Sequence, residues 1–247
     1  MNNITLSFLL TIFAGFSTLL GTLLIFFKTK KENIIISSSL AFASGVMLSV
    51  SITDLIPESL TLLSTSSSDL SICFYSLIFI VIGIIFSMLI DYYLPTEFNN
   101  NSLYKLGIIS MLAIILHNIP EGIATFLTAN KDISLGVSLA IAITLHNIPE
   151  GISIAVPIYY STKKKSKALL YTFISALSEP FGALLAFLFL KNIITDNFMG
   201  CLLSFIAGIM IHISLCELLP NSFKYKKKKH TIFFFILGIL FMLLRLF

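Results

Sequence analysis

The chain has 247 residues, of which 57% are hydrophobic and only 11% are charged. That charged share is about half of what soluble domains carry, and the mean hydropathy is +0.98. This composition excludes a soluble monomer, a nucleic-acid-binding domain and a disordered chain, and it predicts a polytopic helical membrane protein. The formal net charge is +4, and three well-separated cysteines predict neither a disulfide framework nor a thiolate metal site.

Eight apolar stretches are predicted to cross the membrane as helices, because unpaired backbone groups are costly in lipid. In chain order the predicted spans lie near residues 4–27, 34–56, 72–94, 104–128, 133–157, 168–190, 198–219 and 231–247. These spans leave room only for short connections. We therefore predict an all-α fold with a single transmembrane domain over residues 1–247.

Basic residues divide unequally between the two sides of the predicted bundle. Thirteen of the sixteen lie in the loops near 28–33, 95–105, 158–167 and 220–230, which share one side. The positive-inside rule makes that side cytoplasmic and places both termini outside. The alternative interpretation, that these lysine clusters bind nucleic acid or particular lipids, is less favoured.

The second span shares a pattern with the seventh at a constant offset along the chain. Gly45, Met47, Ser51, Leu55, Pro57 and Ser59 match Gly208, Met210, Ser214, Leu218, Pro220 and Ser222, and Asp54 matches Glu217. Spans five crossings apart run in opposite directions, so the match indicates an inverted repeat relating spans 1–3 to spans 6–8 around a central pair. Chance similarity between two apolar helices that each end in an acid–proline pattern is the alternative.

The hexapeptide His-Asn-Ile-Pro-Glu-Gly occurs twice, at 117–122 in the fourth span and at 146–151 in the fifth. Its His and Glu are four residues apart and therefore share one helix face, with the Asn beside the Glu. Each copy can present an imidazole nitrogen, an amide oxygen and a carboxylate to one point. This donor set suits divalent transition metals and a site of moderate affinity, because it lacks thiolates.

Pro120 and Pro149 leave the carbonyls of Leu116 and Leu145 without their helical partners, which would let each helix bend. Ionisable groups inside a span are costly and usually functional. A single buried His–Glu pair is more often a structural hydrogen bond, but two identical sets favour metal binding. Glu179 in the sixth span again stands next to a Pro and close to a Gly, so we expect it to join the same site or to be a structural carboxylate.

The paired motif resembles that of the ZIP family of metal transporters, and in particular its bacterial ZupT-like branch. The supporting features are His-Asn-x-Pro-Glu-Gly in the fourth and fifth spans and Ser-Glu-Pro-x-Gly in the sixth. Ala-Ser-Gly-Val-Met-Leu and Asp-Leu-Ile-Pro-Glu in the second span also fit, as do Ala-Gly-Ile-Met and Glu-Leu-Leu-Pro in the seventh. The resemblance covers essentially the whole chain.

The resemblance implies a two-metal transport site and uptake into the cytoplasm across the cell membrane. One metal would be held by His117, Glu121, His146 and Glu150, and the second by Asn118, Glu121, Asn147, Glu150 and Glu179. Met47 would be an entrance residue. The implied partners are the lipid bilayer, divalent ions and a second copy of the chain in a homodimer, with no nucleic acid. Zn²⁺ is the expected substrate, with Fe²⁺, Mn²⁺, Co²⁺ and Cd²⁺ as further candidates.

Other candidates in the path of an ion are Asp54 and Glu217, near the predicted ends of their spans, and His212 in the seventh span. Asp54 and Glu217 would be gate carboxylates or interfacial acids, and His212 a pathway residue or a bystander. An intramembrane metal-dependent hydrolase is the alternative function, but the position after each His carries an amide rather than the glutamate of His-Glu-x-x-His. A third possible function is that of a metal sensor or scaffold that binds metal without transporting it. We expect no enzyme activity.

Overall fold

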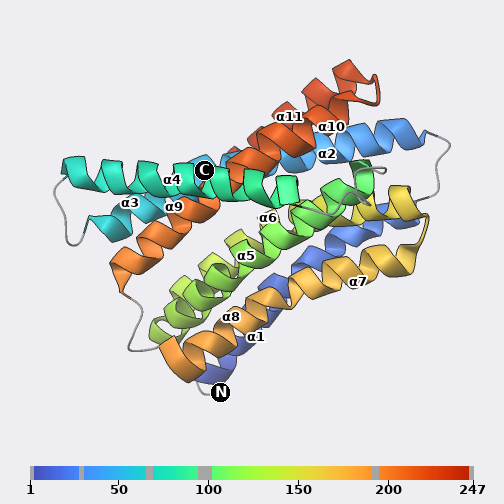
Figure 1. The fold of residues 1–247 in the computed structure, drawn as a ribbon. Helices are drawn as coiled ribbons and strands as arrows, with labels where there is room; N and C mark the ends of the chain where they lie inside the picture. The colour runs from blue at the N-terminus through green and yellow to red at the C-terminus, as the bar shows by residue number, and fades with distance from the viewer. Residues whose placement is uncertain (1–2, 28–30, 65–68, 94–101, 191–194, 245–247) are drawn as a thin grey trace. The chain divides into compact units, whose positions relative to one another are not determined.

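The computed structural model describes residues 3–27, 31–64, 69–93, 102–190 and 195–244, and it places them in helices with no strand (Figure 1). Seven helical stretches of this described part are long and apolar enough to cross a membrane. They are Asn3–Phe26, Glu32–Leu63, Ser71–Tyr93, Ser102–Lys131, Ile133–Thr162, Lys165–Phe189 and Asp196–Phe223. Helix α11 (Lys228–Leu243) is a further, shorter apolar helix. The predicted all-α polytopic fold is confirmed.

Several of these stretches contain tighter or wider helical turns. The first span joins α1 (Asn3–Ser17) to the 3₁₀ segment η1 (Thr18–Phe26), and the sixth joins α7 (Lys165–Ala176), α8 (Ser178–Leu185) and the π-helical η4 (Ala186–Leu190). The third to fifth spans are single helices. They are α4 (Asp69–Tyr93), α5 (Ser102–Lys131) and α6 (Ile133–Thr162).

The second and seventh spans are longer than the sequence predicted. In the second span, α2 (Glu32–Val50) passes through a π-helical turn, η2 (Ser51–Leu55), into α3 (Ile56–Leu63). In the seventh, α9 (Asp196–His212) continues through the π-helical η5 (Ile213–Leu218) into α10 (Leu219–Phe223). The predicted ends near 56 and 219 were wrong, because each proline sits in the first turn of a new helix, where its missing N–H costs little.

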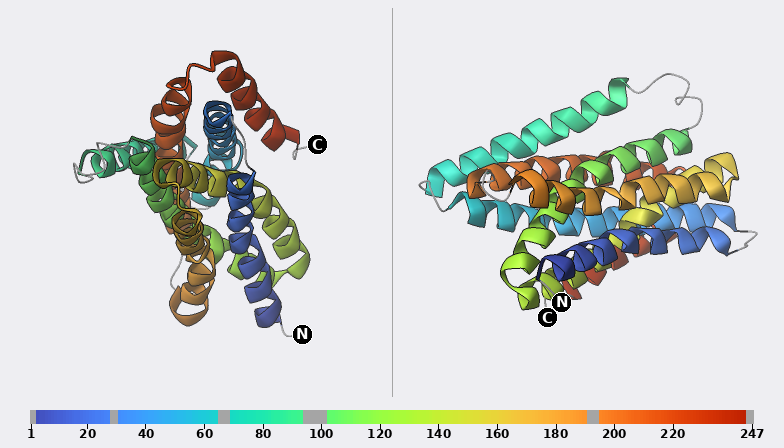
Figure 2. Two further views of the ribbon diagram at one scale, coloured as in Figure 1. Left: turned by 90° about the vertical axis from the view of Figure 1, so that its right-hand side faces the viewer. Right: turned by 90° about the horizontal axis from the view of Figure 1, so that it is seen from below.

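The described helices form two compact units. The first comprises residues 1–28 and 110–193, and the second residues 29–109 and 194–247. In the first unit α6 packs against α1, η1 and α7, while in the second α2 packs against α11 and α9 packs against α3 and α4 (Figure 2). The single transmembrane domain over 1–247 stays a prediction.

Hydrogen bonds between side chains join the second and seventh spans within the second unit. Ser44 in α2 bonds to Ser214 in η5, with 3.0 Å between the two hydroxyls, and Ser59 in α3 bonds to Ser204 in α9. The partner number falls as the residue number rises, so the two spans run antiparallel. Both spans place a π-helical turn at the same repeat position, since Ser51 in η2 and Ser214 in η5 are repeat partners.

Close backbone crossings in this unit follow the same repeat. A Cβ added at Gly45 or Gly238 would overlap a carbonyl of the partner helix where α2 crosses α11. A Cβ added at Gly208 or Gly83 would likewise overlap a carbonyl of the partner helix where α9 crosses α4. Gly45 and Gly208 are repeat partners, so each central helix of the unit lies in backbone contact with an outer helix of the opposite half. Small residues allow such close approach in membrane helices.

A one-residue turn in the first unit joins α5 to α6. Asp132 caps α6, and its side chain accepts hydrogen bonds from the backbone amides of Ser134 and Leu135 at 2.8 and 3.2 Å. Gly136 leaves no room for a Cβ beside Ala129 of α5, which brings the two helices together at this end. The α5–α6 hairpin therefore fixes how deep each hexapeptide lies.

Candidate metal site in the first unit

The two hexapeptides meet near the midpoints of α5 and α6. His117 lies 15 residues before Asp132, the residue of the turn, and His146 lies 14 residues after it. At about 1.5 Å per residue both imidazoles lie roughly 20 Å from the turn. A short turn and a near-symmetrical placement of the motif therefore bring the two copies to the same depth.

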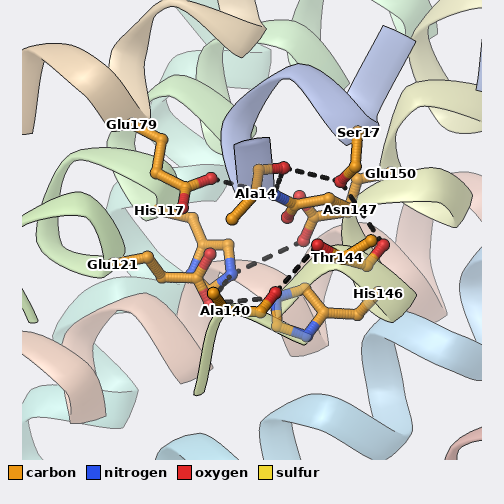
Figure 3. Close-up of polar contacts among 10 residues, drawn as sticks. All are labelled: Ala14, Ser17, His117, Glu121, Ala140, Thr144, His146, Asn147, Glu150 and Glu179. Carbon is orange, nitrogen blue, oxygen red and sulfur yellow. Dashed lines mark hydrogen bonds and ion pairs between the residues drawn. The ribbon is translucent and has the colours of Figure 1, made fainter. Parts of the chain in front are cut away.

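Three side chains form the centre of the site (Figure 3). Oε1 of Glu121 lies 3.2 Å from Nε2 of His117 and 3.0 Å from Nε2 of His146. One ligand atom from each of these residues lies within 4.8 Å of the others. Glu150 approaches the same point, with Oε1 3.5 Å from Nε2 of His117. The α-helical spacing of four thus directs the predicted His and Glu pairs inward from both helices.

A second group of contacts ties this centre to the first and sixth spans (Figure 3). The side-chain amide of Asn147 donates to Oε2 of Glu179 at 2.9 Å and to the carbonyl of Ala14 at 3.0 Å. Ser17 donates to the same Ala14 carbonyl at 2.6 Å and to the Thr144 carbonyl at 3.4 Å. Glu179 therefore lies beside Asn147 of the second hexapeptide, and its membership of the metal site stays a prediction.

Burial of the site is nearly complete. His117, Asn118, Asn147 and Glu179 have no exposed surface, and Glu121 retains only 7%. Within the described residues, neither Asn118 nor the second oxygen of Glu150 has a hydrogen-bond partner, and Oε1 of Glu179 has none either. Burying such groups is costly unless something compensates them. A divalent cation would compensate the carboxylates and use the amide oxygens.

The donor atoms determine what the site can hold. Two imidazole nitrogens and several carboxylate and amide oxygens suit Zn²⁺ and its neighbours in the first transition series. The three cysteines, Cys73, Cys201 and Cys216, all lie in the second unit, so no thiolate of the described chain belongs to the first unit. This set favours an exchangeable ion over a permanently held structural one.

The residues proposed for the path of the ion lie elsewhere. Met47 is fully buried in α2. Asp54 lies in η2 and accepts a hydrogen bond from Thr53 at 3.1 Å, and Glu217 lies in η5, where its backbone carbonyl accepts from Asn221 at 2.7 Å. Both lie in π-helical turns inside continuous helical stretches, nine and six residues before Leu63 and Phe223 respectively. Their position near the ends of the membrane spans stays a prediction.

His212 has a structural partner in the described chain. Its Nδ1 lies 2.9 Å from the hydroxyl of Ser87 in α4, and the side chain is buried in α9. The ring borders a hollow of about 490 Å³ that is also lined by Asp91 and Met88. These contacts give His212 a packing role within the second unit, and a pathway role stays a prediction.

Sequence reasoning missed the contribution of the first span. The carbonyl of Ala14 orients Asn147, and Ser17 joins this carbonyl to α6. A backbone carbonyl leaves no mark in an amino-acid pattern, so Ala14 could not have been found. Ser17 could have been, because Ser-x-x-x-Gly occurs at 17–21 and again at 178–182 around Glu179.

The fold and the buried donors define a class: a polytopic membrane protein with an intramembrane cation site. Residues 95–245 match the family described as ZIP Zinc transporter. The chain is 38% identical to the zinc transporter ZupT of Clostridium perfringens, covering 98% of this chain and 95% of that protein. Proteins with the same name from Streptococcus mutans and Lysinibacillus sphaericus are 38% and 40% identical over 96% and 90% of this chain.

The chain therefore belongs to the ZIP zinc transporter family. This confirms the resemblance inferred from the paired hexapeptide. The family is one of transporters, so the chain is not an enzyme and the intramembrane hydrolase is excluded.

Proposed function

We propose that this protein takes up Zn²⁺ across the cytoplasmic membrane through the site formed by α5, α6 and α8. The single observation that carries the proposal is the meeting of His117, Glu121 and His146, whose ligand atoms lie within 4.8 Å of one another at mid-helix. The names of the ZupT relatives support zinc as the substrate. Fe²⁺, Mn²⁺, Co²⁺ and Cd²⁺ are further substrates to be tested.

The finer proposal is a site for two ions. One ion binds His117, Glu121, His146 and Glu150, and the other binds Asn118, Glu121, Asn147, Glu150 and Glu179, with both central carboxylates bridging. The contact of Asn147 with Glu179 supports this arrangement, because it brings two members of the second donor set together. Bridging carboxylates also lessen the repulsion between two ions at close range.

An orientation follows from the lysines. Lys163 to Lys165 and Lys167 surround the α6–α7 connection, and Lys226 to Lys229 surround the start of α11. Lys28, Lys30, Lys191 and Arg245 also enter the charge asymmetry and lie outside the described residues. We propose that the lysine-rich connections are cytoplasmic, that both termini are outside and that the protein is a homodimer. Cysteine labelling from either side tests the orientation, and light scattering in detergent tests the dimer.

Flux into sealed vesicles tests the function directly. Purified protein is reconstituted into proteoliposomes that contain a zinc-sensitive dye, and external Zn²⁺ is added with and without competing divalent ions. We expect saturable zinc entry that protein-free vesicles lack and that Glu150→Gln abolishes. Glu58→Gln is the matched control, because Glu58 is an exposed carboxylate of the second unit. Equal flux through Glu150→Gln and the unmodified protein would contradict the proposal, as would the lack of flux through the unmodified protein.

A further inference from the structure

The first hexapeptide lies where α5 and α8 cross in backbone contact. A Cβ added at Gly122 would overlap the carbonyl oxygen of Glu179, and one added at Gly182 would overlap the carbonyl oxygen of Ile119. Both glycines are therefore required for the approach of these two helices. The crossing places Glu179 beside the hexapeptide of α5.

The second hexapeptide makes the same crossing with the first span. A Cβ at Gly151 would overlap the carbonyl oxygen of Thr18, and one at Gly21 would overlap that of Ile148. Gly151 and Ile148 hold the same places in the second hexapeptide as Gly122 and Ile119 hold in the first. In the opposing spans, Gly21 follows Thr18 by the same spacing as Gly182 follows Glu179. The two crossings are thus one arrangement repeated, and Thr18 occupies the position of Glu179.

Two independent features support this equivalence. The helix of the first span changes to 3₁₀ geometry at Thr18, and the helix of the sixth span restarts at Ser178 after an interruption at Leu177. Immediately before Thr18, Ser17 donates its hydroxyl to the Ala14 carbonyl, and immediately before Glu179, Ser178 donates to the Ser175 carbonyl in the same way. Mid-helix changes of this kind often mark functional positions.

The two half-sites differ in how their polar groups are satisfied. In one half, Asn147 donates to Glu179. The counterparts in the other half are Asn118 and Thr18, both with no exposed surface. The Thr18 hydroxyl and both polar atoms of the Asn118 amide have no hydrogen-bond partner among the described residues. A hydroxyl buried in this way is costly to a fold that does not use it.

We propose that Thr18 is a further residue of the transport site, whose hydroxyl oxygen binds the divalent cation together with the amide oxygen of Asn118. This neutral half-site is the counterpart of the charged half-site formed by Asn147 and Glu179. The inference rests on the proposed zinc transport and adds the first span to its ligands. Two neutral oxygens, from the Thr18 hydroxyl and the Asn118 amide, bind a cation more weakly than a carboxylate does. This half-site would therefore hold the ion only transiently.

A neutral counterpart also limits the total charge of the site. Glu121, Glu150 and Glu179 already bring three carboxylates into one buried region. A fourth at position 18 would strengthen the hold on a divalent ion and slow its release. Threonine thus supplies oxygen coordination without this penalty, and we assign it a role in setting affinity.

Substitution of Thr18 by the isosteric valine separates this role from a structural one. Removing an unsatisfied buried hydroxyl leaves the thermal stability of the metal-free protein unchanged or raises it. In proteoliposomes, however, Thr18→Val should raise the KM for Zn²⁺ about fivefold, the effect of losing one neutral ligand of ordinary strength. Thr18→Ser, which keeps the hydroxyl, should restore the KM to within about twofold of the original value.

Thr11→Val is the matched control. Thr11 lies in the same span, is fully buried and donates its hydroxyl to the Ser7 carbonyl at 2.9 Å. This substitution should lower thermal stability and leave the KM unchanged. The reverse ranking, with KM altered by Thr11→Val and not by Thr18→Val, would overturn the inference.

An exchange of the two side chains provides a second test. Glu179→Thr should reduce zinc uptake, and adding Thr18→Glu should recover part of it, because the carboxylate returns at the equivalent position. The failure of this rescue, together with an unchanged KM in Thr18→Val, overturns the role of Thr18 while zinc transport by the unmodified protein stands. An unmodified protein that neither binds nor transports Zn²⁺ overturns both proposals.

Discussion

The two units share one construction and differ in what fills their centres. Each crosses its helices in backbone contact at paired glycines that repeat along the chain. In the second unit the central polar groups are mainly hydroxyls that bond to one another, as Ser59 and Ser76 do with Ser204. In the first unit the centre holds two histidines and three carboxylates, and several of the carboxylate oxygens have no hydrogen-bond partner among the described residues.

This difference shows how a membrane protein can separate scaffold from site. Paired hydroxyls satisfy each other and hold helices together at a modest gain per bond. Imidazoles and carboxylates concentrated at one depth are costly without a ligand. The buried cluster of candidate metal ligands therefore lies in the first unit, whereas paired hydroxyls join the helices of the second unit.

The largest expected effect comes from neutralising the carboxylate that both histidines share. Glu121→Gln keeps the shape and can still hydrogen-bond to His146, but it removes the charge that attracts the cation. We expect zinc uptake to fall by at least about 100-fold, more than the loss typical of an outer-shell partner. Uptake is measured in proteoliposomes, and residual uptake above one tenth of the original would contradict the assignment.

Glu121→Gln should also distinguish the effect of Glu121 on the stability of the metal-free fold from its effect on zinc binding. Saturating zinc at 100 times its Kd stabilises a binding protein by about 2.7 kcal/mol. Glu121→Gln should lose this zinc-dependent rise in Tm while its metal-free Tm stays equal or increases. A lowered metal-free Tm would instead indicate that Glu121 mainly supports the fold.

A smaller effect is expected at the edge of the site. Glu179→Gln removes one carboxylate but can keep a contact with Asn147 through its amide oxygen. We expect zinc affinity to fall by about 10- to 30-fold, within the range for groups that support metal ligands. Equilibrium titration in detergent measures the Kd, and an unchanged Kd would remove Glu179 from the second donor set.

A substitution among the paired serines of the second unit should lower stability and leave zinc uptake unchanged. Ser204→Ala breaks the bonds to Ser59 and Ser76 and should cost about 1 kcal/mol, or about 3 °C in Tm. The zinc uptake of each folded molecule should be retained. A loss of uptake with no loss of stability would assign the transport function to the second unit.

The smallest effect is expected at His212. Replacing it with alanine removes its hydrogen bond to Ser87, so stability should fall slightly. Zinc uptake should change less than about twofold, since the lost bond is a neutral one of modest worth. A tenfold loss of uptake would restore His212 to the path of the ion.

The sequence predicted the helical class, the paired site and the place of Glu179 because each rests on a regular pattern. Apolar length sets the spans, and the spacing of four directs His117 and Glu121 to one face. The ends of the second and seventh spans were not predictable, because proline after a π-helical turn continues a helix instead of ending it. Ala14 could not be assigned, since its role depends on a backbone carbonyl. The Ser-x-x-x-Gly pattern aligns Thr18 with Glu179 in the sequence, but the equivalence of the two positions depends on a crossing between distant spans.

X-ray absorption at the zinc edge tests the central claim most directly, that the first unit holds the cation with nitrogen and oxygen ligands. We predict zinc–nitrogen and zinc–oxygen distances of about 2.0–2.2 Å, no sulfur neighbour, and loss of bound zinc in Glu121→Gln. A sulfur neighbour at about 2.3 Å would place the ion at a cysteine of the second unit and contradict the account. The same spectrum and zinc content in Glu121→Gln would also contradict it.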